Sequence, residues 1–487
     1  MFQDKFFLVL AKISMLMKKF GLAVSCSLIV SISFSQTINQ KLRKAFQHFE
    51  KDEQLKHAVS SLYVIDAKTG SVIFDKNSQI GLAPASTQKI ITSVTAFELL
   101  GKDYRYKTEL GFVGKNDDGT INGSMVLIGS GDPTFGSWRW ERTKPDSILH
   151  EFTSCVSESG IRFFKNSYDF GIRHFETQNI PDGWIWQDLG NYYGSGASAL
   201  NWRENQFDII LASGKKIGDS VDVISYKPRI TSFQVWSEAK SAAKGTGDNS
   251  FVYLPIGHNE IIVRGTIPIN ENKFSISASF PNPEIQFMRD LLDSLTIRRI
   301  GFGSNEPGKI GLLNGKKIKT NPLYKIICIH NSPSLDSIIY WFNKKSINLY
   351  GEALIKTFAY EKQGFGSTDS GVAIVKKFWR EKGLDELELN IGDGSGLSPQ
   401  NRVTTHAQVE ILKYAKSKSW FPYFSKSLPE HNGMTMKSGT IKDVKGFCGY
   451  HKSKDGSEYI FSFLVNNYNG SAGQLVNKMY KVLDVLK

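Results

Sequence analysis

The sequence predicts a mixed α/β fold in which one α/β domain is interrupted by a long β-rich insertion. The 487 residues exceed one ordinary domain, since domains of roughly 150 residues are typical. Helical and strand patterns alternate near both ends of the chain, whereas residues 105–300 consist of short Gly-, Thr-, Val- and Ile-rich segments with turn signals. Hydrophobic residues make up 40% of the chain, so it can bury a core.

The first elements are expected in the order helix, hairpin, helix. A polar helical stretch covers residues 37–56. The next segment, SSLYVIDAKTGSVIFDKN, alternates and breaks at Gly70, which predicts two antiparallel strands joined by a turn. In LAPASTQKIITSVTAFELLG, Pro84 and Ser86 open an apolar-periodic segment that stops at Gly101. This pattern predicts a helix with Ser86 at its N-terminal end.

The C-terminal part returns to helical and hairpin patterns. Helices are expected in PEIQFMRDLLDSLTI, SLDSIIYWFNKKSINLYGEALIKTFAY and GVAIVKKFWREKG. The chain ends with GFCGYHKSKDGSEYIFSFLVNN and GQLVNKMYKVLDVLK, which predict a hairpin and a closing helix. We therefore expect one split α/β domain over residues 36–104 and 303–487.

The N-terminus has the features of a secretory signal peptide. Two lysines precede the apolar run FGLAVSCSLIVSISFS, and the small residues Ser33 and Ser35 occupy the −3 and −1 positions of a cleavage site. We expect residues 1–35 to be removed on export to the periplasm or cell envelope. A retained membrane anchor is disfavoured because lysines interrupt the apolar character. A lipoprotein acylated at Cys26 is disfavoured because AVSC is a poor lipobox.

Charge, histidines and cysteines exclude several classes of function. The net charge of +13 suits anionic partners, yet the basic residues form no tract and no nucleic-acid module, so no nucleic acid partner is expected. The histidines and cysteines lack HExxH and CxxC spacing, so no metal or cofactor is expected. The mature chain keeps Cys155, Cys328 and Cys448. This odd count allows at most one disulfide, and we expect none.

Ser86 and Lys89 form a Ser-x-x-Lys motif at the start of the predicted helix. A serine nucleophile without a histidine base needs another proton acceptor, and a lysine one helical turn on can supply it. The helix N-terminus offers an unpaired backbone N–H to an oxyanion and helps to lower the pKa of the lysine. The motif alone is weak, because Ser213 with Lys216 matches it as well.

Two further motifs follow in the required order. Ser-Ile-Asn at 346–348 lies between two helical patterns, where a short turn can point both polar side chains into a cleft. Lys-Ser-Gly-Thr at 437–440 precedes a strand pattern, as a substrate site on an edge strand requires. We therefore expect the segments near residues 86, 346 and 437 to converge on one cleft.

With these motifs the chain resembles the penicillin-binding D-alanyl-D-alanine carboxypeptidases and endopeptidases of peptidase family S13, the low-molecular-mass class C type. The resemblance runs from about residue 60 to the end and includes PASTQK, IGSGDPTF, WIWQDLGNYYGSGASALNW, HNSPSL, GDGSGLSPQNR and KSGTIKDVKGFCGY. It implies a β-lactamase/transpeptidase-like domain, with an antiparallel sheet flanked by helices, and two inserted, mostly β domains. We assign residues 105–195 and 275–302 to the first insertion, and residues 196–274 to the second.

The resemblance implies catalytic roles for matching residues. Ser86 forms the acyl-enzyme, and Lys89 takes its proton. Ser346 relays a proton to the leaving amine, while Asn348 holds Lys89 and the scissile region in place. The backbone N–H groups of Ser86 and Thr440 form the oxyanion hole.

The resemblance also implies substrate-binding residues. Lys437 attracts the terminal carboxylate of the substrate, Ser438 and Thr440 donate hydrogen bonds to it, and Gly439 allows close approach of the substrate backbone. Asp188 resembles an acid of the inserted domain that meets the amine of diaminopimelate. The implied partners are peptidoglycan stem peptides and, as inhibitors, β-lactams; the oligomeric state and the balance of carboxypeptidase and endopeptidase activity stay open.

The chain departs from the family pattern at a few positions. Ile347 replaces a polar residue, and Ser438 replaces the threonine of Lys-Thr-Gly; neither change removes a group that the mechanism needs. Pro399 stands where arginine is common, so recognition of the stem peptide beyond D-alanine is open, with Arg402 as a candidate to compensate.

Two other functions stay open. A β-lactamase would use Glu386 as a deacylating glutamate, yet LELNIGDGSG alternates like a strand that runs into a turn. A catalytically idle peptidoglycan-binding protein would keep only the fold, but the intact motifs argue against it. A literal Lys-Thr-Gly at 68–70 precedes the nucleophile and is interpreted as the turn of the first hairpin.

Overall fold

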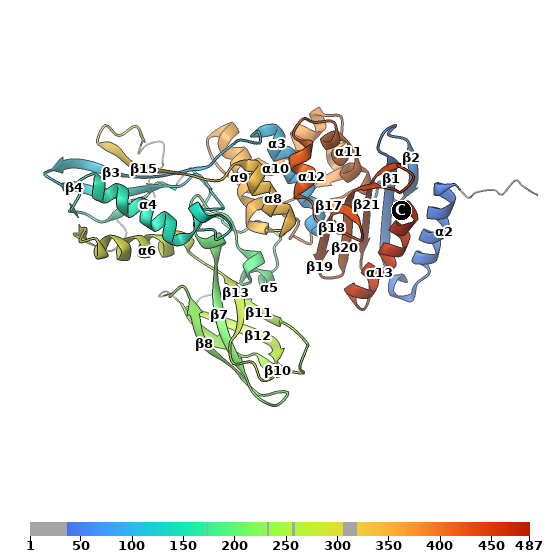
Figure 1. Cartoon of the computed structure of the whole chain (residues 1–487), viewed down its shortest axis with the longest axis horizontal. Helices are drawn as coiled ribbons and strands as arrows, with labels where there is room; N and C mark the ends of the chain where they lie inside the picture. Colours follow the sequence, from blue (N-terminus) through green and yellow to red (C-terminus); the bar gives the residue numbers. More distant parts are fainter. Residues whose placement is uncertain (1–36, 173, 231–232, 256–258, 305–318) are drawn as a thin grey trace, which may run out of the picture.

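Both ends of the chain form one body of sheet and helices, from which two further regions extend (Figure 1). The predicted leader and Cys26 lie outside the described residues. Within the described ranges, no helix is both long and apolar enough to cross a membrane. The computed structural model describes residues 37–487 apart from residues 173, 231–232, 256–258 and 305–318.

A six-stranded antiparallel sheet joins the two ends of the chain, in the order β18-β19-β20-β21-β1-β2. The predicted N-terminal hairpin, β1 (Val59–Asp66) and β2 (Val72–Lys76), pairs with the C-terminal strand β21 (Glu458–Asn466). The Lys-Ser-Gly-Thr motif lies within β19 (Met434–Ile441) rather than before a strand. Only two residues of β18 pair with β19, so the rest of β19 forms an edge of this sheet. The remaining strands are β20 (Val444–Lys452) and β18 (Glu430–His431).

Alternating residues of β1 face two different cores, as the pleat of a strand requires. Leu62 and Val64 pack against α2 (Ile38–Glu50) and α13 (Ala472–Leu483) on one face. On the other face, Tyr63 and Ile65 join the main helical core. That core is built from α3 (Lys89–Leu99), α8 (Leu335–Lys344), α9 (Asn348–Gln363), α10 (Thr368–Glu381), α11 (Thr405–Lys416) and α12 (Phe421–Ser427).

The second region is a mixed sheet covered by two helices, α4 (Pro145–Glu158) and α6 (Pro283–Ile297). The sequence predicts α6 but not α4, so this region is less purely β than expected. The apolar spacing of Ile148, Phe152 and Val156 places three fully buried side chains on one face of α4. The strands are β3 (Lys107–Asp117), β4 (Thr120–Ile128), β5 (Phe163–Phe164), β6 (Tyr168–Phe170), β14 (Gly301–Phe302) and β15 (Tyr324–Asn331).

The third region consists of two small sheets that share one core, which includes Ile209 and Val263. β7 (Gln206–Ser213), β8 (Val221–Lys227) and β13 (Phe274–Ser279) form one sheet. The other contains β9 (Gln234–Ser237), β10 (Lys240–Ala242), β11 (Asn249–Tyr253) and β12 (Glu260–Pro268).

Strand pairing bears on where the regions begin and end. β15 pairs with β3, although residues from 303 onward were expected to belong to the split α/β domain. β13 pairs with β7 of the third region, although residues from 275 onward were assigned to the second. We propose that the chain leaves the third region after Ser279 and re-enters the first body after Asn331.

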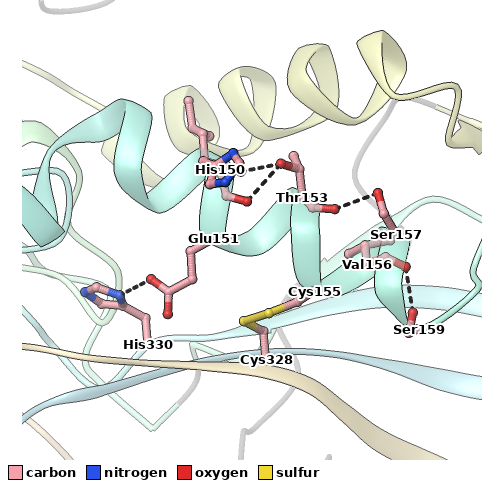
Figure 2. Close-up of a disulfide and its surroundings, with 10 residues drawn as sticks. His150, Glu151, Thr153, Cys155, Val156, Ser157, Ser159, Cys328 and His330 are labelled. Carbon is pink, nitrogen blue, oxygen red and sulfur yellow. Dashed lines mark hydrogen bonds and ion pairs between the residues drawn. A yellow bond between two sulfur atoms is a disulfide. The ribbon is translucent and has the colours of Figure 1, made fainter.

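A disulfide joins Cys155 of α4 to Cys328 of β15, with 5.9 Å between the Cα atoms (Figure 2). The expectation of no disulfide is therefore wrong. The two residues are 173 positions apart and meet only because α4 packs against β15. An odd cysteine count could not reveal this pairing, and the third cysteine, Cys448, is a buried free thiol.

Candidate active site

A cavity of about 1060 Å³ lies where the first body meets the third region. Its lining residues come from both parts, and they include five of the predicted catalytic and substrate-binding residues. The three motifs therefore converge on one cleft, as predicted. The five residues are Ser86, Asp188, Ser346, Asn348 and Thr440.

Ser86 lies on a single 3-10 turn, Ala85–Gln88, that leads directly into α3. The turn is closed by Thr87, whose backbone N–H and hydroxyl both donate to the Pro84 carbonyl, at 3.2 and 2.6 Å. Ala85 has φ of 47°, a conformation that is unfavourable for a residue with a Cβ atom. The strained turn presents the Ser86 hydroxyl at the cavity wall while Thr87 and Gln88 stay buried.

Lys89 lies directly beneath Ser86 and is fully buried, with 0% exposure. Its Nζ donates to Ser86 Oγ at 2.9 Å, to Asn348 Oδ1 at 2.6 Å and to the Ser395 carbonyl at 2.8 Å. Burial lowers the pKa of Lys89 well below its ordinary value, and the nearby charge of Lys437 lowers it further. When neutral, the amine has two hydrogens, which Asn348 and the Ser395 carbonyl can accept, so its lone pair is free to accept the Ser86 proton and Lys89 can act as a general base.

Two buried carboxyl groups oppose this lowering of the Lys89 pKa. Asp393 accepts hydrogen bonds from Gln88, Trp184, Asn401 and the backbone of Gly396 and Ser398, so it shapes the loop that carries the Ser395 carbonyl. Glu352 accepts from the Gly394 N–H at 2.9 Å. Burial, with a contribution from the Asp393 charge, raises the pKa of Glu352 to about 8.

Lys437 and Ser346 form the opposite side of the site. The Nζ of Lys437 donates to Ser346 Oγ at 3.0 Å and to the Ser438 carbonyl at 2.8 Å. The side chain is 1% exposed, and burial lowers the pKa of Lys437 to about 7. Ser346 has φ of 55°, so the turn between α8 and α9 points its hydroxyl at the lysine.

Asn348 connects the reaction centre to the inserted part of the chain. Its Oδ1 accepts from Lys89, while its Nδ2 donates to the Tyr193 carbonyl at 2.7 Å. Tyr193 in turn donates from Oη to Asp188 at 3.4 Å, and burial raises the pKa of Asp188. The short helix α5 (Trp186–Leu189), which carries Asp188, thus lies beside the reaction centre.

Gly439 packs against the backbone that carries the nucleophile. A Cβ atom at this position would lie 2.7 Å from the Pro84 carbonyl oxygen and 2.9 Å from the Ser86 nitrogen. Only a residue without a Cβ atom lets β19 lie this close to the nucleophile turn. The Cβ position of Gly439 is thus occupied by the nucleophile turn, and close approach of the substrate backbone to Gly439 stays a prediction.

The other predicted binding residues of the Lys-Ser-Gly-Thr motif, Ser438 and Thr440, lie on the same strand, β19. Thr440 is exposed, and its Oγ1 accepts from Lys445 Nζ at 2.6 Å. Ser438 is half-buried, and its carbonyl accepts a hydrogen bond from Lys437. Pro399 lines the cavity. The guanidinium of Arg402 donates to the carbonyls of Pro399 and Asn401, at 2.6 and 2.7 Å, so it supports the loop.

The two alternative motifs, Glu386 and the Lys-Thr-Gly at 68–70, do not line the cavity. Glu386 pairs with Arg380 of α10 at 3.1 Å and does not line the cavity, which gives the β-lactamase alternative no support. The Lys-Thr-Gly at 68–70 forms the hairpin turn, with Gly70 at φ of 74°. Asp66 accepts hydrogen bonds from the backbone of this turn.

Sequence reasoning missed the supporting residues of the site. Glu352 lies one helical turn after Asn348 on the same face of α9, so its spacing carried a usable signal. Asp393 was part of a quoted block but received no role. Lys445 and the Tyr193 carbonyl had no signal, because their positions depend on strand pairing and on the docking of the insertion.

The chain is similar to known proteins in sequence and in fold. A D-alanyl-D-alanine carboxypeptidase of Actinomadura sp. is 25% identical over 469 residues, covering 89% of this chain and 82% of that protein. The fold is similar to crystal structures of penicillin binding protein 4 (dacB) from Haemophilus influenzae. One has a TM-score of 0.76 at 20% identity, and one in complex with a β-lactam has a TM-score of 0.71 at 18% identity. Both matches cover 91% of this chain and 98% of the Haemophilus chain.

The model of the D-Ala-D-Ala carboxypeptidase 3 (S13) family matches residues 42–484, which span all three motifs and both inserted regions. A match of this length to the family model assigns the whole architecture, and not only the nucleophile turn. This chain therefore belongs to the D-Ala-D-Ala carboxypeptidase 3 (S13) family.

Proposed function

We propose that this chain cleaves the terminal D-Ala-D-Ala bond of peptidoglycan stem peptides through an acyl-enzyme on Ser86. The observation that carries the proposal is the 2.9 Å hydrogen bond between Lys89 and Ser86, made by a lysine whose burial lowers its pKa. This arrangement supplies a neutral base within reach of the nucleophile without a histidine.

The mechanism follows from the hydrogen bonds around the nucleophile. Neutral Lys89 takes the Ser86 proton as Oγ attacks the scissile carbonyl carbon. The backbone N–H groups of Ser86 and Thr440 donate hydrogen bonds that stabilise the negative charge on the carbonyl oxygen. Ser346, held by Lys437, relays a proton to the amine of the leaving D-alanine, and the C–N bond breaks. Water then hydrolyses the Ser86 ester and restores the hydroxyl.

The buried charge of Lys437, which contacts the cavity-lining Ser346, supports the choice of ligand. Protonated Lys437 attracts the carboxylate of the terminal D-alanine, and β-lactams bear a carboxylate in the equivalent place, so we expect them to acylate Ser86 as inhibitors. Asp188 lines the same cavity, which supports our proposal that it meets an amine of the stem peptide. A substrate in the wall requires export, which fits the leader expected over residues 1–35.

A direct test combines labelling with product analysis. We expect fluorescent penicillin to label the purified mature protein on the peptide that contains Ser86, and Ser86→Ala to remove the label. Mass spectrometry of purified muropeptides should show loss of one alanine, and cleavage of cross-linked dimers will report any endopeptidase activity. A native protein that neither binds the drug nor releases D-alanine contradicts the proposal.

We expect the carboxylate-dependent step to weaken as pH rises through about 7. The pKa of Lys437 is lowered to about 7, so the side chain is charged below this pH and neutral above it. The second-order acylation rate constant, which reports the free enzyme, should therefore fall above about pH 7 for benzylpenicillin. The methyl ester of the same drug, which lacks the carboxylate, serves as the control. A falling limb of equal depth for both compounds contradicts the role of Lys437.

We expect Gly439→Ala to slow acylation by about 10- to 100-fold, because its Cβ atom would displace the backbone of Ser86. The rate of penicillin acylation measures the effect. Gly473→Ala is the matched control, since a Cβ atom on Gly473 would lie 3.7 Å from Ser471 Oγ, which is an ordinary contact distance. Equal acylation rates for the two variants would show that the nucleophile turn tolerates the shift.

A further inference from the structure

We propose that the cavity continues into a subsite for a neutral sugar of the glycan strand, built by the third region. The inference rests on the proposed function, because the sugar would belong to the same substrate. The candidate wall comprises Tyr192, which begins a short 3-10 turn (Tyr192–Gly194), with Gln206 of β7, Phe251 of β11 and Gln187 of α5. Figure 1 shows α5, β11 and β13 at the junction with the first body.

The aromatic part of this wall is open to solvent. Tyr192 is 55% exposed although it lines a cavity, and its hydroxyl bonds to no other described residue. Phe251 is half-buried and lines the same cavity. An exposed aromatic face in a concave site is available to a ligand, and the C–H face of a sugar ring can stack on it.

The polar part of the wall is uncharged and unpaired. The side-chain amides of Gln187 and Gln206 donate to and accept from no other residue in the described part of the chain. Each amide offers two donor hydrogens and one acceptor oxygen. Hydroxyl and N-acetyl groups of an amino sugar need both kinds of partner, whereas a carboxylate or an amine is better served by a charged side chain.

Charge and size favour a sugar over a second stretch of peptide. Arg139 and Glu204 also line the cavity but neutralise each other in an ion pair of 2.7 Å. A volume of about 1060 Å³ lies at the upper limit of sites for small ligands, which leaves room beyond a D-Ala-D-Ala terminus. Stem peptides carry several charges, and besides Asp188 the charged side chains of the lining outside the Arg139–Glu204 pair, Lys345 and Lys442, follow α8 and β19 of the first body. The wall built by the third region is therefore left uncharged.

The wall is held in a fixed position relative to Ser86. Asn191 Oδ1 accepts from the Val252 N–H at 3.0 Å, which docks the α5 segment on β11. The Tyr193 carbonyl accepts from Asn348, the residue that also bonds Lys89. A sugar seated against Tyr192 would therefore help to orient the stem peptide toward the nucleophile.

The test compares kcat/KM for D-alanine release from a disaccharide-pentapeptide and from the same pentapeptide without sugar. We expect the wild-type protein to prefer the disaccharide form. Tyr192→Ala and Gln206→Ala should each reduce that preference by about three- to tenfold, the size of one stacking contact or one set of hydrogen bonds. Tyr192→Phe, which keeps the ring, should retain most of it.

Trp236→Ala is the matched control, because this tryptophan is 56% exposed on β9 and does not line the cavity. Equal kcat/KM for the two substrates in the wild-type protein overturns the proposal. An equal loss of kcat/KM for both substrates in the variants also overturns it. A loss of kcat/KM confined to a sugar-free cross-linked peptide dimer overturns it as well, because it would assign the wall to peptide binding. Failure of the proposed function looks different, since no D-alanine would then be released from either substrate.

Discussion

Replacing Lys89 with methionine should slow penicillin acylation of Ser86 by about 10²- to 10⁴-fold, the usual contribution of a general base. Lys89 Nζ is the group that lies 2.9 Å from Ser86 Oγ, and no histidine takes part in this hydrogen bond. Methionine keeps the length and apolar stem of the side chain, so the loss reports the missing base more than a missing volume. Lys89→Ala should be at least as slow, since it also opens a cavity.

The chain provides a matched control for this experiment. Lys356 is also fully buried, and its Nζ donates to the carbonyls of Gln178 and Ala197 at 2.7 and 2.8 Å. Lys356→Met should lower stability while the folded fraction acylates at close to the wild-type rate. If Lys89→Met retains near-wild-type acylation, or if both variants lose activity equally, Lys89 is not the base.

The site motifs were predictable because each is short and locally encoded. A Ser-x-x-Lys pair at the start of a helix places the two side chains one turn apart whatever the rest of the fold does, and Lys89 Nζ does reach Ser86 Oγ. The position of Lys437 opposite Ser346 needed the whole sheet to form. Only the order of the motifs and the family resemblance made that convergence predictable.

The elements that were missed depend on contacts between distant segments. β15 is recognised as part of the second region only through its pairing with β3, which is the basis for the boundary that we propose after Asn331 in place of the one expected at residue 303. α4 carried its own apolar spacing, yet it was overlooked inside a stretch dominated by turn and strand signals. Asn348 shows why such contacts cannot be predicted from sequence. Its Nδ2 donates to the backbone carbonyl of Tyr193, and no side-chain pattern encodes the position of that carbonyl.

Removing the Cys155–Cys328 disulfide should lower the free energy of unfolding of the second region by about 3 to 5 kcal/mol. The bond closes a loop of 173 residues, and a cross-link between such distant positions removes much of the freedom of the unfolded chain. The paired variant Cys155→Ala/Cys328→Ala should therefore unfold at a lower urea concentration than the wild-type protein. Reductant should lower the wild-type midpoint to the same value and leave the paired variant unchanged.

Cys448→Ala is the matched control, because it removes a buried free thiol and no cross-link. Its midpoint should fall by much less and should still respond to reductant. Thiol titration of the denatured, unreduced mature protein should count one free thiol, and a count of three would show that the bond is absent. Acylation of Ser86 should survive in the paired variant under native conditions, since the nucleophile, its base and Lys437 all belong to the first body. A large loss of acylation at unchanged stability would instead mean that α4 and β15 position the reaction centre.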